Sequence, residues 1–365
     1  MCVNFGALGA VRTLGDTLGQ AGGTTSGKVQ GMSMSAAHPS LAQRRWQGLG
    51  CALLGAVAFS GKAILAKLMY RQGADAVAVV GLRMAMAFPL FLLMAWWASQ
   101  RSQGALGPAP LSRKVVWQVI GLGFCGYYLS STLDFLGLQY ISASLERAIL
   151  YLNPSIVLLL SVVLLGQRLR LAQLGAMALS YGGVLVVFLH DWDVATMVSG
   201  AAAGVDPAQA VLTGSVLVFL SAASYAVYLM GSGQLVASLG SLRLVGWASC
   251  AACVMCVLQW AVAHAVTDGR LGAVSHLPAS VWALSALNAT ACTVLPVWLV
   301  MRGVQLLGAP MASQAGMVGP LSTIWLAAWW LNEPVTWRLL LGTAAVLAGI
   351  VVLTRASARA EAAQT

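Results

Sequence analysis

From Trp46 onward, the sequence returns repeatedly to apolar runs of about 20 residues, each long enough to cross the ~30 Å hydrocarbon core of a bilayer as a helix. In lipid, every backbone N–H and C=O group must be bonded within the protein, so such runs form α-helices. The runs predict spans at 48–68, 76–98, 115–138, 143–165, 172–189, 213–232, 243–263, 281–301, 309–331 and 337–354. We therefore predict an all-α integral membrane protein with ten transmembrane helices.

The low content of charged residues points to the same class. Charged residues make up 8% of the chain, whereas soluble domains carry about 25%. The net charge of +10 does not indicate a nucleic-acid partner, because the basic residues are scattered singly between the apolar runs. We expect the partners to be the lipid bilayer and a small-molecule substrate.

Three of the seven cysteines, Cys250, Cys253 and Cys256, have a spacing that holds iron–sulfur clusters in other proteins. They lie inside the apolar run Leu244–Val262, and no fourth ligand is near them in the sequence. Small, weakly polar residues are ordinary in membrane helices. We therefore expect no metal site and no cofactor.

The spans fall into two groups of five, separated by a longer acidic link. We expect residues 1–45 to be a disordered cytoplasmic tail or a mis-assigned start, with true initiation at Met32 or Met34. The rest is predicted to comprise a first five-helix repeat at 46–190, an outer linker at 191–212, a second repeat at 213–356 and a cytoplasmic tail at 357–365.

The distribution of Lys and Arg predicts the direction of the spans, because cytoplasmic loops carry an excess of both. With a cytoplasmic N-terminus, eleven fall inside: Arg44, Arg45, Arg101, Arg113, Lys114, Arg168, Arg170, Arg243, Arg302, Arg355 and Arg359. Three fall outside: Arg71, Arg270 and Arg338. We expect a multi-pass protein of the cell (inner) membrane with both termini in the cytoplasm.

An internal repeat relates the two halves at an ungapped offset of 166 residues. The aligned pairs include Gly137 with Gly303, Ala143 with Ala309, Pro154 with Pro320, and Gly183 with Gly349. Each repeat has five spans, an odd number, so the second copy must enter the membrane upside down. Inverted repeats recur in secondary transporters, with the substrate site near mid-membrane between the halves.

The chain resembles the EamA-type transporters of the drug/metabolite transporter superfamily. The resemblance rests on the order of three features: the five-plus-five helices, the Gly-x-Arg-Leu turn at 166–169 after Pro154, and the stretch AFSGKAILAKLMYRQGADAVAVVGLRMAMAFPL with its Lys67 and Arg83. It implies a ten-helix inverted repeat, a central cavity lined by the third, fourth, eighth and ninth helices, and transport of small metabolites, often as efflux. The family's Gly-Glu turn reads Gly166-Gln167 in the first copy and Asn332-Glu333 in the second.

Besides Lys67 at the end of the first span, five charged residues lie within the spans of the first copy: Lys62, Arg83, Asp134, Glu146 and Arg147. The predicted topology places all five ~6–10 Å below the outer surface. Such residues are costly in a membrane and usually face a cavity or one another. Adjacent residues point about 100° apart on a helix, so at most one of Glu146 and Arg147 should line a cavity.

Two interpretations of this group compete. One is a set of structural ion pairs, such as Asp134 with Arg147 or Lys62, with snorkelling of Lys67 and Arg83 to the interface. The other places Asp134 or Glu146 on a proton or substrate pathway, with the cations meeting a substrate carboxylate or phosphate. The group has one positive charge in excess, which favours an anionic group on the substrate.

Further candidate site residues are polar or break the helix. On the fourth span, Tyr151 lies about one turn beyond Arg147, and Pro154 frees a backbone carbonyl and could kink the helix. The second copy offers Asn288, Thr290 and Thr293 on the eighth span and Ser313, Gln314 and Pro320 on the ninth. The hydroxyl and amide groups could instead tie helices together.

The sequence favours a secondary active transporter, an exporter of small polar metabolites such as amino acids or related compounds, with proton exchange. The alternatives are an intramembrane enzyme, or a membrane sensor or channel. No HExxH or GxxxxGK[ST] motif is present, so we expect neither an enzyme nor an ATP-driven pump. The small residues of the fifth and tenth spans could serve tight packing or a homodimer.

Overall fold

The computed structural model describes residues 41–101, 112–166, 169–198, 206–268, 277–307 and 309–362. Every regular element within these ranges is a helix. Nine helices in this part of the chain are long and apolar enough to cross a membrane. The described residues therefore confirm the predicted all-α membrane class, while most of the predicted N-terminal tail lies outside them.

The first five-span group begins earlier and ends later than the hydropathy pattern predicts. Its long helices are α1 (Leu41–Tyr70), α2 (Ala76–Arg101) and α7 (Leu171–Val198). The third span consists of α3 (Arg113–Gly123), the π-helical turn η1 (Phe124–Leu129) and α4 (Ser130–Leu138), and the fourth of α5 (Ala143–Leu150) and α6 (Asn153–Leu165). The start of the predicted 191–212 linker is thus the helical end of α7.

The second group repeats this plan. Its long helices are α8 (Pro207–Leu239), α9 (Ser241–Asp268) and α14 (Trp337–Ala362). The eighth span comprises α10 (Ala279–Ala289), η3 (Thr290–Val294) and α11 (Leu295–Leu307), and the ninth comprises α12 (Ala309–Gly316), α13 (Val318–Leu326) and η4 (Ala327–Leu331). The ninth span is predicted as one helix, but it is interrupted at Met317, and it is not among the nine spans counted above.

The irregularities of the two halves recur at the offset found in the sequence. The π-helical turns begin at Phe124 and Thr290, and α5 and α12 begin at Ala143 and Ala309, in each case 166 residues apart. The fourth and ninth spans end at Gly166 and Asn332, again 166 residues apart, with φ of 66° and 57°. Such left-handed residues terminate helices by satisfying the last carbonyls. The repeat is therefore present in the backbone as well as in the sequence.

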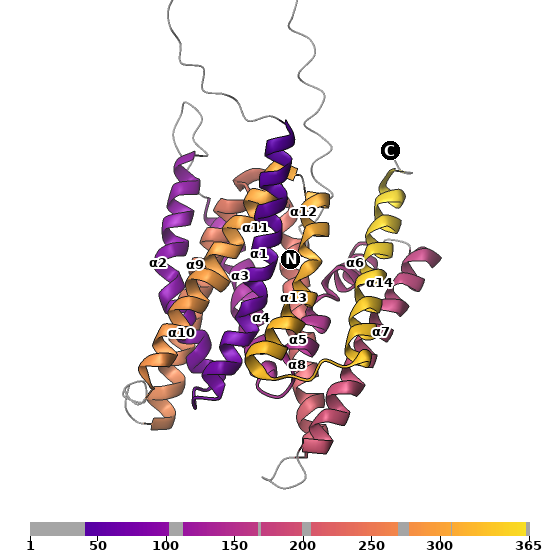
Figure 1. Ribbon diagram of the computed structural model, residues 1–365. Helices are drawn as coiled ribbons and strands as arrows, with labels where there is room; N and C mark the ends of the chain where they lie inside the picture. Colours follow the sequence, from indigo (N-terminus) through magenta and orange to yellow (C-terminus); the bar gives the residue numbers. More distant parts are fainter. Residues whose placement is uncertain are drawn as a thin grey trace, which may run out of the picture.

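Four helix pairs make the principal packing contacts: α1 with α11, α4 with α8, α2 with α9, and α7 with α14. Exchange of the two halves turns the contact of α1 with α11 into that of α8 with α4, because α1 corresponds to α8 and α11 to α4. The contacts of α2 with α9 and of α7 with α14 each join two corresponding helices, so the exchange leaves them unchanged. In Figure 1, α2 and α9 lie at one side of the bundle and α7 with α14 at the other, while α4, α5 and α13 lie between them. The beginning of α1 and the end of α14 lie at the same end of the bundle.

Proline explains the breaks in the central spans. Pro154 cannot donate a hydrogen bond to the carbonyl of Leu150, four residues earlier, and the Asn153 side chain donates to it instead at 2.8 Å. Pro320 occupies the equivalent position in the ninth span and likewise leaves the carbonyl of Gly316 without its helical donor. Each half thus presents an interrupted helix near the middle of the bundle.

Candidate functional site

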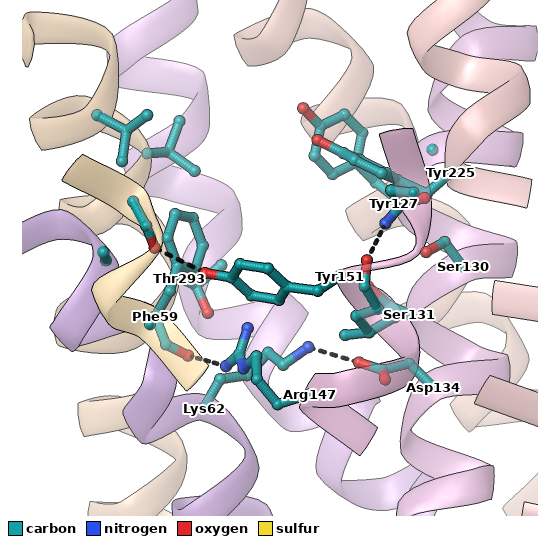
Figure 2. A pocket seen from close by; sticks show the side chains of 18 of the residues that line it. Phe59, Lys62, Tyr127, Ser130, Ser131, Asp134, Arg147, Tyr151, Tyr225 and Thr293 are labelled. Carbon is teal, nitrogen blue, oxygen red and sulfur yellow. Dashed lines mark hydrogen bonds and ion pairs between the residues drawn. The ribbon is translucent and has the colours of Figure 1, made fainter. Parts of the chain in front are cut away.

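A cavity of about 220 Å³ lies among the central spans and is bounded by both halves. Its wall combines charged, hydroxyl-bearing and apolar side chains. The polar residues that matter below are Lys62, Arg83, Tyr127, Ser130, Ser131, Asp134, Arg147, Tyr151, Tyr225 and Thr293. Figure 2 shows nine of these side chains with Phe59, drawn from segments far apart in the sequence. The resemblance implied such a central cavity, and α1, α2 and α8 contribute to it in addition to the expected spans.

Lys62 joins three helices at one end of the cavity. Its ammonium lies 2.5 Å from a carboxylate oxygen of Asp134 on α4 and 3.4 Å from one of Glu146 on α5. Of the two pairings considered for Asp134, the structure contains the one with Lys62. A buried pair must have good geometry to offset its desolvation, and removal of one partner leaves a costly unpaired charge.

Arg147 ties the same end of the cavity to the second half. Its guanidinium donates to the carbonyl of Phe59 at 2.8 Å and to the hydroxyl of Thr323 on α13 at 3.2 Å. It lies 3.9 Å from Glu146, which is fully buried and does not line the cavity, whereas Arg147 does. This division matches the expectation for neighbouring residues on one helix.

Arg83 differs from the other cations. The residue is only 3% exposed, so the suggestion that it snorkels to the interface is wrong. Its guanidinium carbon lies 4.4 Å from the centroid of the Phe135 ring, a cation–π contact. Among the described residues, its Nε and Nη2 atoms have no hydrogen-bond partner, and no carboxylate lies within 4.0 Å of it.

Tyr151 spans the cavity from the break in the fourth span to the break in the ninth. Its hydroxyl donates to the carbonyl of Gly316 at 2.7 Å, which is the carbonyl that Pro320 leaves free. In Figure 2 the Tyr151 ring lies between the charged residues and the Tyr127–Tyr225 pair. Pro154 lines the cavity, whereas Pro320 is buried beside it and acts through this freed carbonyl.

The polar residues predicted in the second half are divided. Thr293 lines the cavity, and the Asn288 amide donates to the carbonyl of Lys62 at 3.4 Å. Thr290 is exposed and bonds the carbonyl of Ala286 in its own helix. Gln314 is exposed and is not among the cavity-lining residues, and the side chain of Ser313 lies outside the described part.

Sequence reasoning missed the hydroxyl-rich face of the third span. Tyr127, Ser130, Ser131 and Asp134 all line the cavity. Their spacing of i, i+3, i+4 and i+7 places them on one face of a helix, a signal that could have identified them from Asp134 alone. The hydroxyl of Tyr127 also donates to that of Tyr228 at 3.1 Å.

A second group of contacts lies at the end of the bundle at which α1 leads into α2. Glu333 accepts a hydrogen bond from the backbone N–H of Ala143 at 3.0 Å, at the start of α5. Lys67 lies 3.7 Å from the same carboxylate, so it is paired rather than snorkelling. Arg71 donates to the carbonyl of Leu331 at 2.6 Å. These contacts join α1, α5 and the segment before α14.

The three cysteines singled out in the sequence lie together on one helix. Within the described residues, no group of three or more His, Cys, Asp or Glu side chains is placed to hold a metal ion. Cys250, Cys253 and Cys256 are buried on α9, with Cys253 Sγ 3.7 Å from the sulfur of Met84. Their surroundings are those of small apolar residues at a helix contact.

Comparison with known proteins identifies one family. The sequence profile described as the EamA-like transporter family matches residues 46–189 and again residues 212–355. A Bacillus subtilis (strain 168) protein named "Uncharacterized transporter YcbK" is 32% identical over 284 residues, covering 77% of this chain and 84% of the relative. A solved structure titled only "Crystal structure of protein" matches with a TM-score of 0.49 and 19% identity, covering 86% of this chain and 99% of that one.

Proposed function

The chain belongs to the EamA-like transporter family, and we propose that it is a secondary active transporter that exports a small polar metabolite, such as an amino acid or a related compound. The observation that carries the proposal is the cavity of about 220 Å³ bounded by both halves, with ionisable and hydroxyl side chains in its wall. Its place between repeats fits the substrate site of inverted-repeat transporters.

The broken spans support a transport cycle. The two halves have similar backbones, so each can adopt the conformation of the other. When they do so, a substrate bound between them becomes accessible from the opposite side of the membrane. Tyr151 and Gly316 join the halves at their breaks, and the contacts of Glu333 with Ala143 and Lys67 close one end. In this arrangement the closed end would open as the other closes.

Proton exchange is supported by the charge balance around Lys62. Two carboxylates, Asp134 and Glu146, share its ammonium, and Glu146 also lies near Arg147. Protonation of Asp134 would leave Lys62 paired with Glu146, so Lys62 keeps a carboxylate partner when the proton binds. We propose Asp134 as the proton carrier and Glu146 as the fixed counter-ion.

The family membership favours transport over the alternatives of an intramembrane enzyme, a sensor or a channel, and the proposal gives no residue a catalytic role. The Lys and Arg distribution supports cytoplasmic termini in a cell (inner) membrane. A fluorescent-protein fusion at Thr365 should then fluoresce, and a periplasmic alkaline phosphatase fusion at the same site should be inactive. Active phosphatase would reverse the proposed orientation.

The decisive experiment uses purified protein in liposomes. Metabolites released by cells with and without the protein are compared first, and each differing compound is then tested for counterflow and for uptake driven by an imposed pH gradient. Protein-dependent counterflow of at least one compound is expected. If none of the released compounds is exchanged by well-folded protein, the chain is not a transporter of small metabolites.

A further inference from the structure

Arg83 carries the one positive charge of the cavity that lacks a nearby carboxylate among the described residues. Lys62 contacts both Asp134 and Glu146, and Arg147 lies near Glu146 and donates to Phe59 and Thr323. Those two cations and two carboxylates balance. Because Arg83 is 3% exposed, its charge is also poorly reached by bulk water.

Burying a charge without a counter-ion is costly, so an unbalanced buried charge marks a site where the counter-ion comes from elsewhere. The Phe135 ring covers one face of the guanidinium, and the Nε and Nη2 atoms at its edge are buried. The Nε and Nη2 atoms on that edge, which have no partner in the described part of the chain, can bind the two oxygens of a carboxylate together.

We propose that Arg83 binds a carboxylate of the transported substrate and that the substrate is a monoanion rather than a zwitterion. This inference rests on the proposed transport function and narrows its substrate to a related compound with a net negative charge, because a free amino acid is a zwitterion. The five ionisable side chains, three cations and two carboxylates, carry a net charge of +1. A monoanion balances this charge, whereas a zwitterion has no net charge and does not.

The remainder of the cavity wall indicates the rest of the substrate. Tyr127, Tyr151 and Tyr225, with Phe59 and Phe91, present aromatic surface to the cavity. The hydroxyls of Ser130 and Ser131 lie on the same helix face as Asp134 and offer hydrogen bonds to a neutral amide or hydroxyl group. An aromatic carboxylate with a neutral polar group, such as an N-acylated aromatic amino acid, can contact both the aromatic surface and the serine hydroxyls.

The test compares three probes on protein in lipid nanodiscs: N-acetyl-tyrosine, its uncharged amide and free tyrosine. Wild-type protein should bind the N-acetyl acid at least about tenfold more tightly than either of the others, since a charge-assisted hydrogen bond contributes on the order of 1.5–3 kcal/mol. Arg83→Gln should remove the preference for acid over amide, Arg83→Lys should keep part of it, and Arg302→Gln, a change at an exposed cation outside the cavity, should leave it unchanged.

The inference is overturned if wild-type protein binds acid and amide equally, if it prefers the zwitterion, or if folded Arg83→Gln keeps the full preference. If Arg83→Gln does not fold, the wild-type ranking and Arg83→Lys decide. Transport is scored separately in liposomes. Binding of the acid without transport would contradict the proposed function, whereas transport of only neutral or zwitterionic compounds would contradict the role of Arg83.

Discussion

The hydroxyl of Tyr151 donates a hydrogen bond to the carbonyl of Gly316, 2.7 Å away, and so connects the interruption in one half of the molecule to the interruption in the other. The acceptor is free because Pro320, four residues later, has no N–H to give it. A side chain of the first half thereby completes the backbone hydrogen bonding of the second. This contact should influence how the halves move relative to one another.

Substitution of Gly319 by alanine tests that contact, because an added Cβ would overlap the Tyr151 hydroxyl. We expect Gly319→Ala to lower counterflow several-fold and to destabilise the protein by about 1–3 kcal/mol. In a Tyr151→Phe background, which removes the hydroxyl, the same substitution should cost less. Gly121→Ala, where an added methyl meets open space, serves as the control. Equal costs in both backgrounds would show that the contact is unimportant.

Asp134→Asn should separate proton coupling from substrate exchange. Lys62 keeps Glu146 as a carboxylate partner in this variant. We expect uptake driven by a pH gradient to fall to the rate without a gradient, while counterflow persists. Unchanged pH dependence would exclude Asp134 as the proton carrier. A drop in folded yield without a change in coupling would identify a purely structural pair.

Lys62→Gln should be more damaging than Asp134→Asn. It leaves Asp134 and Glu146 without the cation they share, and removal of one partner from a buried ion pair costs about 3–5 kcal/mol. Thermal unfolding in detergent measures the difference. If the two variants unfold at the same temperature, the ammonium does not hold the carboxylates together.

Glu333→Gln should weaken the closed end of the bundle. The carboxylate lies at the start of α5, where a negative charge is favoured by the helix dipole, and it lies near Lys67. We expect a loss of about 1 kcal/mol in unfolding free energy, and faster reaction of a cysteine placed at Ser144 with a water-soluble thiol reagent. Glu333→Asp is the matched control, because it keeps the charge. No change in reactivity would mean that Glu333 does not close this end.

Adjacent glycines on α7 provide an internal comparison for helix packing. An added Cβ at Gly183 would overlap the backbone of α14, whereas at Gly182 it would meet nothing within 4 Å. Gly183→Ala should therefore destabilise the protein by about 1–3 kcal/mol, and Gly182→Ala should not, since alanine is the better helix former. The contrast, measured by thermal unfolding, would assign these small residues to packing within one chain. Similar effects at both positions would contradict that assignment.

Hydropathy and the repeat predicted most of the fold because both depend on local composition. They located every span, with ends that differ from the helix ends by up to nine residues, and the offset of 166 reappears in the helix breaks. The interruption at Met317 was not predicted, since average hydropathy is the same for a broken and a continuous apolar segment. The extension of α7 beyond 190 was missed because Asp191 and Asp193 resemble loop residues, although Asp191 accepts hydrogen bonds from Ser142.

Part of the candidate site could be predicted from the depth of its ionisable residues below the outer membrane surface. Lys62, Asp134, Glu146 and Arg147 come together as their common distance from the predicted surface suggested. Depth alone does not give the direction in which a side chain points around its helix. For that reason the sequence identified neither the partners of Lys67 nor the exposure of Gln314.

The matching helix breaks have a consequence for how such a protein can diversify. Both halves keep the same backbone interruptions, while the ionisable side chains of the cavity belong to one of them. Random libraries confined to residues 127–154 should therefore yield variants with new selectivity at a higher rate than libraries over 293–320. The helix breaks are therefore duplicated in this chain, whereas the charged residues of the cavity are not. Substitutions in the first half can change selectivity while the backbone of both halves is kept.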